Sequence, residues 1–185
     1  MTKTNNQFDQ AIQLCKDLFM SKMKDYGTSW RIMRPNSITD QLYIKAHRIQ
    51  SIEMKGEQLV EDNIASEFMG IINYGIIGLI QLDLSNDINL ELSADESERL
   101  YSEKAQQAKD LMMNKNHDYG EAWREMRVSS FTDLILTKIF RVKQIEDNAG
   151  QTIVSEGIDA NYYDIINYAI FAIIKLEIEK LEDLL

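Results

Sequence analysis

A stretch of this 185-residue chain occurs twice, and this repetition constrains the fold more than any other feature. Residues 16–53 and residues 109–146 lie 93 positions apart and are identical at 19 of 38 positions. Residues 71–82 and residues 165–176 lie 94 positions apart and are identical at 7 of 12 positions. Unrelated segments do not agree to this extent, so the chain is a tandem duplication.

Both copies keep a set of mostly polar and aromatic residues. Because the copies differ at about half of their aligned positions, the retained residues are candidates for a shared structure or a shared site. In the first copy they are Asp25-Tyr26-Gly27, Trp30-Arg31, Arg34, Asp40, Lys45, Arg48, Glu53 and Asn73-Tyr74.

The charge and the cysteine content exclude several classes of protein. With 30 acidic against 20 basic residues, the net charge of −10 opposes the broad basic surface that duplex DNA requires. The apolar runs at 71–82 and 165–176 are shorter than the ~18–20 residues that span a bilayer, and the N-terminus has no apolar signal core. The single Cys15 cannot form an internal disulfide. We expect a cytoplasmic protein with no duplex nucleic-acid or membrane partner, and homo-oligomerisation stays open.

Apolar residues at helical spacing predict three helices in each copy. The first copy should form helices at about 6–24, 37–55 and 62–82, and the second at about 94–116, 130–147 and from about 155 to the C-terminus. Gly27 suits the left-handed residue that follows a helix. No segment has a convincing strand pattern, which predicts an all-α protein. Three segments have the form of N-terminal caps, namely Ser37-x-x-Asp40, its copy Ser130-x-x-Asp133, and Ser93-x-x-Glu96.

The third helix of each copy is apolar around most of its circumference, so a three-helix unit cannot cover it alone. Gly75 and Gly78, matched by Ala169 and Ala172, would let the two third helices approach closely. We therefore predict a six-helix bundle made of two tandem three-helix repeats related by a pseudo-two-fold axis. Repeat 1 spans 6–82, a connector spans 83–93, and repeat 2 spans 94–185, with both repeats in one compact domain.

A lysine interrupts the apolar row of the second helix in both copies. Lys45 and Lys138 occupy core-facing positions, and Arg48 and Arg141 border the same face. A buried ammonium group needs an anion. That anion is either a protein carboxylate, from Asp40, Glu53 or a third-helix acid, or the phosphate of a ligand. Snorkelling of the lysine to the surface is a third reading.

The third helices carry one acid each, Glu67 in the first copy and Asp164 in the second. An acid beside an amide can hold Mg²⁺ through oxygen ligands, which makes Mg²⁺ the one cofactor that the sequence suggests. Asp164, with Asn167 and Tyr168 on the same face, makes the second half the preferred metal candidate. For the asparagines, an interhelix hydrogen bond is the simpler reading.

The segment after the first helix brings aromatic and guanidinium groups together in both copies. Such a set could stack on a base and grip a phosphate, or it could lock a helix end with the aromatic rings plugging the bundle. The candidate base-facing residues are Tyr26, Trp30, Tyr119 and Trp123, and the candidate phosphate ligands are Arg31, Arg34, Arg124 and Arg127. Zinc spacing, a glycine-rich phosphate loop and a nucleophile motif are all missing from the sequence.

The pattern K-x-x-DYG-x-x-W, then D-x-x-x-x-K-x-x-R-I and an apolar helix with N-Y, resembles the family called nucleotide modification associated domain 1. This resemblance covers both halves and implies a role in nucleotide-modification systems. The helices are more distantly similar to MazG-type all-α nucleoside triphosphate pyrophosphohydrolases, which bind Mg²⁺ with E-x-x-E and E-x-x-D. Where the first acid pair would lie, this chain has Lys45-x-x-Arg48.

We therefore expect a protein that binds a nucleotide or another phosphorylated small molecule in two pseudo-equivalent pockets. A divergent Mg-dependent nucleotide pyrophosphohydrolase is the enzymatic form of this expectation. The alternative is a non-enzymatic helical scaffold whose buried ion pairs only fix the packing.

Overall fold

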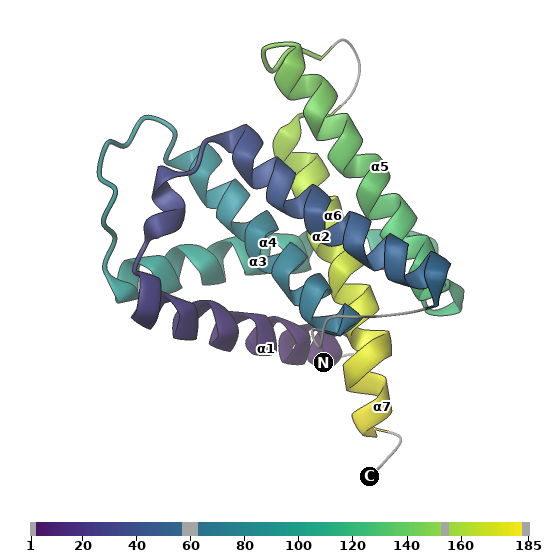
Figure 1. The fold of residues 1–185 in the computed structure, drawn as a ribbon. Helices are drawn as coiled ribbons and strands as arrows, with labels where there is room; N and C mark the ends of the chain where they lie inside the picture. The colour runs from purple at the N-terminus through teal and green to yellow at the C-terminus, as the bar shows by residue number, and fades with distance from the viewer. Residues whose placement is uncertain (1–2, 57–62, 153–155, 183–185) are drawn as a thin grey trace.

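The computed structural model describes residues 3–56, 63–152 and 156–182 (Figure 1). In these residues the chain is helical and contains no strand, which confirms the all-α prediction. The six long helices are α1 (Lys3–Tyr26), α2 (Pro35–Lys55), α3 (Ile64–Asp83), α4 (Ala94–Tyr119), α5 (Val128–Asp147) and α6 (Ile158–Ile173). Short 3-10 turns, η1 (Ser29–Ile32) and η2 (Ala122–Glu125), precede α2 and α5. A π-helical turn, η3 (Ile174–Ile178), links α6 to α7 (Glu179–Glu182).

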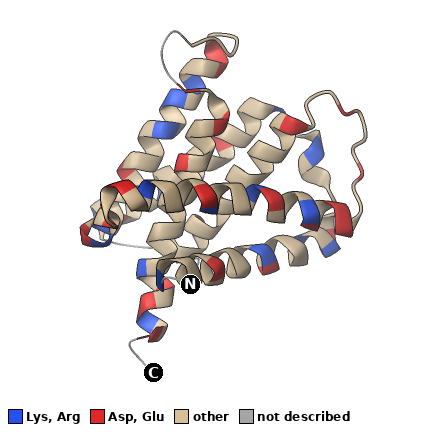
Figure 2. Ribbon diagram, turned by 180° about the vertical axis from the view of Figure 1, so that it is seen from behind, with Lys and Arg blue, Asp and Glu red and all other residues tan. Residues whose placement is uncertain are grey.

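The helices form three layers with α3 and α6 in the middle (Figure 1). One outer layer contains α2, which packs on α3, and α5, which packs on α6, and these two outer helices also touch each other. The other outer layer contains α1 and α4, which lie against each other and against both central helices. Charged residues lie mainly on the outer helices and at helix ends, as the reverse view shows (Figure 2). The apolar third helices of both repeats are thereby buried, as predicted.

The two central helices approach closely where α3 has glycine. A Cβ atom added at Gly75 would lie 2.7 Å from Cγ1 of Ile166, and one added at Gly78 would lie 2.8 Å from Cε2 of Tyr162. Both contacts are tighter than a real side chain tolerates, so the packing requires these glycines. Because rising numbers on α3 meet falling numbers on α6, the two helices run antiparallel.

Contacts between α2 and α5 show the pseudo-two-fold relation directly. In a two-fold interface, residue i touches j on the partner and j touches i. Two such reciprocal pairs occur here: Thr39 donates to Glu146 (2.7 Å) while Thr132 donates to Glu53 (3.1 Å), and Lys143 pairs with Asp40 (2.7 Å) while Gln50 donates to Asp133 (3.3 Å).

These contacts explain why both copies keep Asp40 and Glu53. The side chains hold the repeats together and are not partners of Lys45. Burial raises the pKa of Glu53 and of Glu146, although the threonine hydrogen bond on each lowers it.

Two predicted helix starts were wrong. The second helix begins at Pro35 and its copy at Val128, with Arg34 and Arg127 as cap residues that make no side-chain cap hydrogen bond. Proline suits the first helical position, where no amide donor is needed, so the helix begins two residues before Ser37.

Other predictions about helix ends are confirmed. Ser93 accepts a hydrogen bond from the amide of Glu96 (3.1 Å), and Gly27 has a φ of +58°. Asn63, which was not predicted as a cap, accepts from the amide of Ser66 (2.8 Å) and starts α3. The predicted starts at 62 and 155 lie outside the described residues, as does the predicted end of the last helix.

Among the described residues, only α3 is long and apolar enough to cross a membrane by length and composition. Of its most apolar 18-residue window, 67% is buried inside the bundle, as in the core helix of a soluble protein.

Candidate functional site

Two cavities lie at equivalent places in the two repeats. The N-terminal pocket has a volume of about 180 Å³ and is formed by the end of α1, by η1, α2 and the middle of α3. The C-terminal pocket has a volume of about 310 Å³ and is formed by the end of α4, by η2, α5 and the middle of α6. Five lining positions hold the same residue in both pockets: Lys22/Lys115, Tyr26/Tyr119, Trp30/Trp123, Asn73/Asn167 and Tyr74/Tyr168.

Local backbone geometry explains how the aromatic residues reach each pocket. Gly27 ends α1 in the left-handed conformation, which turns the chain so that η1 folds back onto the bundle. Trp30 then packs against Phe19 with ring centroids 6.4 Å apart. In the second repeat, Trp123 stacks in parallel on Phe171, with centroids 4.3 Å apart.

The tryptophans and the tyrosines of the pockets differ in their exposure to solvent. Trp30 and Trp123 are only 8% and 6% exposed, and their indole N–H groups have no hydrogen-bond partner. A buried donor without a partner is costly, and its presence in both pockets needs a reason. Tyr26 and Tyr119 are 70% and 73% exposed, so core packing does not require them.

Each lysine of the second helix pairs with the acid of its own repeat. Lys45 lies 3.2 Å from Oε2 of Glu67, whose other oxygen accepts from Arg48. Lys138 lies 2.7 Å from Oδ2 of Asp164. Of the partners that the sequence suggested, the structure therefore shows the third-helix acid. The two lysine side chains are 24% and 28% exposed, but only Lys45 is among the residues that line its pocket.

Asp164 has a second partner, because Lys115 pairs with its Oδ1. Burial opposes the charge of Lys138, yet the hydrogen bond that Lys138 donates to Asp164 and the negative charge of Asp164 outweigh burial and raise the pKa of the lysine. Burial, together with the charge of Asp164, also raises the pKa of Tyr168. The carboxylate of Asp164 thus belongs to a partly buried cluster inside the C-terminal pocket.

The two asparagines hold the outer helices onto α3 and α6, as the simpler reading predicted. The amide of Asn73 donates to the carbonyl of Cys15 (3.0 Å), and its oxygen accepts from Tyr101 (2.7 Å). The amide of Asn167 donates to the carbonyl of Ala108 (3.1 Å), but its buried oxygen has no partner. The residue equivalent to Tyr101 is Phe8, which has no hydroxyl to offer.

Seven of the eight predicted phosphate ligands lie outside both pocket linings, because only Lys45 is among the lining residues. Arg31 is buried and donates to the carbonyls of Asp87 and Asn89 (3.0 Å each), which fixes the connector before α4. Arg34 and Arg127 are exposed residues at the starts of α2 and α5.

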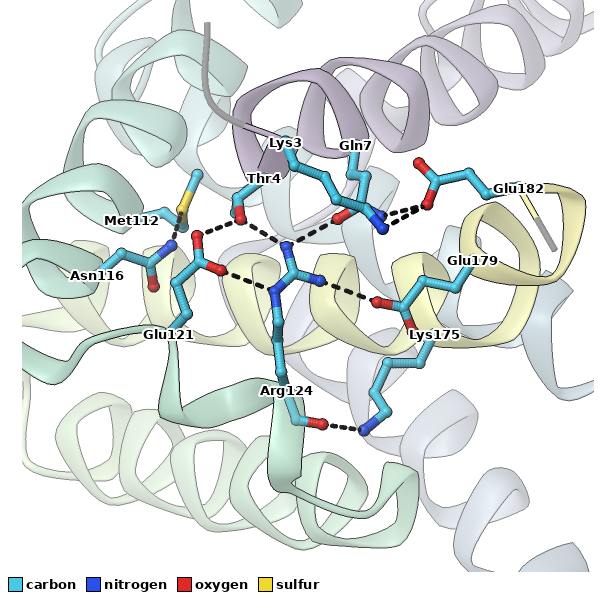
Figure 3. A network of polar contacts seen from close by, with 10 residues as sticks. All are labelled: Lys3, Thr4, Gln7, Met112, Asn116, Glu121, Arg124, Lys175, Glu179 and Glu182. Atoms are coloured by element: carbon cyan, nitrogen blue, oxygen red, sulfur yellow. Dashed lines mark hydrogen bonds and ion pairs between the residues drawn. The ribbon is translucent and has the colours of Figure 1, made fainter.

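Arg124 is the centre of the network in Figure 3. Its guanidinium donates to Glu121 (2.7 Å), Glu179 (2.9 Å), Thr4 (2.6 Å) and Gln7 (2.9 Å), so it ties α1 to η2 and α7. Arg31 and Arg124 therefore act as locks between segments. Arg141 donates to Gln144 (3.3 Å) and is not in the lining of its pocket.

The carboxylates do not fit a resident Mg²⁺ ion. Both oxygens of Glu67 and both oxygens of Asp164 are paired with lysine or arginine. The two acids also lie far apart, because Asp164 lies opposite residues near 76 on α3, roughly 14 Å along the helix from Glu67. Within the described residues, no three His, Cys, Asp or Glu side chains gather in a way that could hold a metal ion.

A family model described as nucleotide modification associated domain 1 matches residues 22–82 and again residues 115–176. The chain belongs to this family. Both matches begin and end at equivalent positions, which agrees with the duplication. Comparisons with curated proteins and with solved structures found no match. Apart from Leu18, Phe19 and Met112, all residues that line the two pockets lie within the segments that match the family.

Sequence reasoning missed several lining residues that the family segments contain. Lys22 and Lys115 are the first residues of the two matched segments, and each stands three positions before the D-Y-G motif. Their identity in both copies was the available signal. Tyr74 and Tyr168 were retained as well, but Tyr168 was considered only as a neighbour of the metal candidate Asp164.

Proposed function

We propose that the protein binds nucleotides or nucleotide-derived ligands in its two pockets and serves nucleotide metabolism or modification in the cytoplasm. The observation that carries this proposal is the identity of five lining residues between pockets that otherwise differ. Every one of the five has a hydrogen-bonding group, and the other equivalent lining positions have changed.

The lining groups match the parts of a nucleotide. An exposed tyrosine beside a pocket offers a face on which a base can stack, and such stacking contributes about 1–3 kcal/mol per base. The unpartnered indole N–H of each tryptophan would donate to an acceptor on the ligand. A lysine at the pocket wall would receive a phosphate.

Cavities of 180 and 310 Å³ are small for ligand pockets, so they suit a single nucleoside or nucleotide that is partly exposed beside the tyrosine, and not a long strand. The pairing of both third-helix acids with cations leaves hydrolysis without a metal ligand set. Binding is therefore the function proposed. A scaffold role is favoured by one observation, since the lysines already have protein partners.

A calorimetric and thermal-shift screen tests the proposal. The ligands are nucleoside mono-, di- and triphosphates and their nucleosides, each with and without Mg²⁺, and chromatography checks the products for hydrolysis. A ligand at 100 times its dissociation constant adds about 2.7 kcal/mol to the free energy of unfolding. Stabilisation by any of these ligands supports binding, and no stabilisation by any of them would support the scaffold.

A variant pair locates the binding. Tyr26→Ala should weaken nucleotide binding while changing stability by less than about 0.5 kcal/mol, because the ring is exposed. Phe140→Ala is the matched control, since Phe140 is also an exposed aromatic residue (53%) but lies outside both pockets. Equal effects of the two substitutions on affinity would contradict the proposed site.

A further inference from the structure

The two pockets have the same aromatic groups but different charge. Two lysines, Lys22 and Lys45, line the N-terminal pocket, and no carboxylate lines it among the described residues. The lining of the C-terminal pocket contains one lysine, Lys115, and one carboxylate, Asp164. The linings therefore differ by two units of charge, although each repeat supplies the same elements.

One position accounts for one of these two units of charge, and the other arises because Lys45 lines its pocket whereas Lys138 does not. Asp164 on α6 is equivalent to Gly70 on α3. A Cβ atom added at Gly70 would lie 2.7 Å from Cε of Lys45, so the lysine side chain lies directly over the bare backbone. The acid that holds Lys45 is Glu67, almost one turn earlier, and it is not in the pocket lining.

The equivalent lysines Lys22 and Lys115 consequently differ in whether a protein carboxylate balances their charge. Asp164 holds both Lys115 and Lys138. Lys22, the counterpart of Lys115, is exposed and has no ion-pair partner within the described part of the chain. Asp164 thus occupies the place that an anionic group of a ligand would take, whereas the N-terminal pocket offers its positive charge to the ligand.

The C-terminal pocket instead offers groups for an uncharged ligand. The buried oxygen of Asn167 has no partner and can accept a hydrogen bond, and the indole of Trp123 can donate one. The equivalent oxygen of Asn73 already accepts from Tyr101. A nucleoside has amino or hydroxyl donors, ring acceptors and no charge, which matches these groups.

We infer that the two pockets bind different classes of ligand. The N-terminal pocket binds a nucleoside phosphate through Lys22 and Lys45, and the C-terminal pocket binds an uncharged nucleoside. This inference rests on the proposed function. Asp164 is the residue that sets the difference, because it neutralises Lys115, the lysine of its own pocket, and would repel a phosphate.

Reciprocal exchange of the two equivalent residues tests the inference. Isothermal titration calorimetry of the full chain would use the four deoxynucleoside 5′-monophosphates and the four deoxynucleosides as probes. The parent should bind one monophosphate per chain. Gly70→Asp should weaken this binding at least tenfold, and Asp164→Gly should create a second monophosphate site.

Matched variants separate the effect of the added or removed charge on binding from effects of side-chain shape and of misfolding. Gly70→Ala introduces the same Cβ contact with Lys45 without the charge, so it should weaken monophosphate binding less than Gly70→Asp does. Asp164→Asn keeps the shape of the side chain and should also admit a second monophosphate. It replaces Asp164→Gly if thermal melts show that the glycine variant does not fold.

Three results would overturn the inference while leaving nucleotide binding in place. The first is two equivalent monophosphate sites in the parent. The second is a single site in the parent with no second site in either Asp164 variant. The third is an equal loss of monophosphate affinity in Gly70→Ala and Gly70→Asp. If neither the parent nor any variant binds any probe, the proposed function itself fails.

Discussion

Replacement of Lys45 tests whether this lysine binds a ligand or only balances the charge of Glu67. If Glu67 depended on Lys45 alone, Lys45→Met would leave an unpaired buried carboxylate and cost roughly 3–5 kcal/mol. In the structure Glu67 also accepts from Arg48, and the Lys45 side chain is 24% exposed. One charged hydrogen bond is lost and no charge is left alone, so we expect a cost of only about 1 kcal/mol.

Glu67→Gln is the comparison that calibrates this expectation. It leaves two cations, Lys45 and Arg48, beside a neutral amide, and we expect a cost of about 2–3 kcal/mol. Urea unfolding at pH 7, with the slope m unchanged, measures both free energies. Titration with the nucleotide identified by the ligand screen then measures binding, and Lys45→Met should weaken it at least tenfold.

The reasoning would be refuted by the opposite pattern. If Lys45→Met costs as much as Glu67→Gln and leaves nucleotide affinity unchanged, the lysine is a structural counter-ion. Lys138→Met repeats the test in the other repeat, where Asp164 would keep Lys115 as its partner. Destabilisation without a change in binding in both repeats would retire the phosphate role of these lysines.

Three further predictions concern stability. Gly75→Leu should cost a few kcal/mol in urea unfolding, because even its Cβ would lie 2.7 Å from a buried side chain of α6; a change below about 0.5 kcal/mol would contradict the close packing. The pKa values of Glu53 and Glu146 are raised in the folded state, so the native protein keeps these protons longer, and the stability that these two groups contribute should be lost as pH rises above about 4.5. Urea midpoints from pH 4 to 7 should show a smaller decline in the double glutamine variant, and an unchanged decline would exclude these two groups as its cause. Arg124→Ala should cost about 2–3 kcal/mol in thermal unfolding through the lost charged hydrogen bonds, whereas Arg127→Ala, at an exposed position, should cost less than about 0.5 kcal/mol; equal costs would contradict the role of the network.

The duplication made most of the fold predictable. Two apolar third helices that need cover, with small residues on one face, leave few arrangements other than mutual packing, and Gly75 and Gly78 lie at that contact. Helix starts were less predictable, because Ser37-x-x-Asp40 fits a cap by composition while Pro35 allows the helix to begin earlier. Asp40 instead contacts the other repeat, and no local pattern shows a partner about a hundred residues away.

The site was predictable in its residue types and less so in their contacts. Tyr26 and Trp30, with their copies, line the pockets as expected. Arg31 looked like a phosphate ligand because guanidinium and aromatic groups lay together in the sequence. Its partners are backbone carbonyls of the connector, which carry no signal in the side-chain sequence. For Asp164, the pairing with Lys138 of α5 was one of the readings of the sequence, whereas the pairing with Lys115 of α4 was not predicted.

The geometry also explains how the two pockets could come to differ in one fold. Each pocket is formed within a single repeat, from residues 18–77 in one case and 112–171 in the other. The contacts that join the repeats are separate, and they involve Thr39 with Glu146 and Thr132 with Glu53. Substitutions at distant sites without shared partners have nearly additive effects. A change such as glycine to aspartate at one of two equivalent positions therefore alters one pocket and leaves both the interface and the other pocket intact, which allows two ligand chemistries within one duplicated fold.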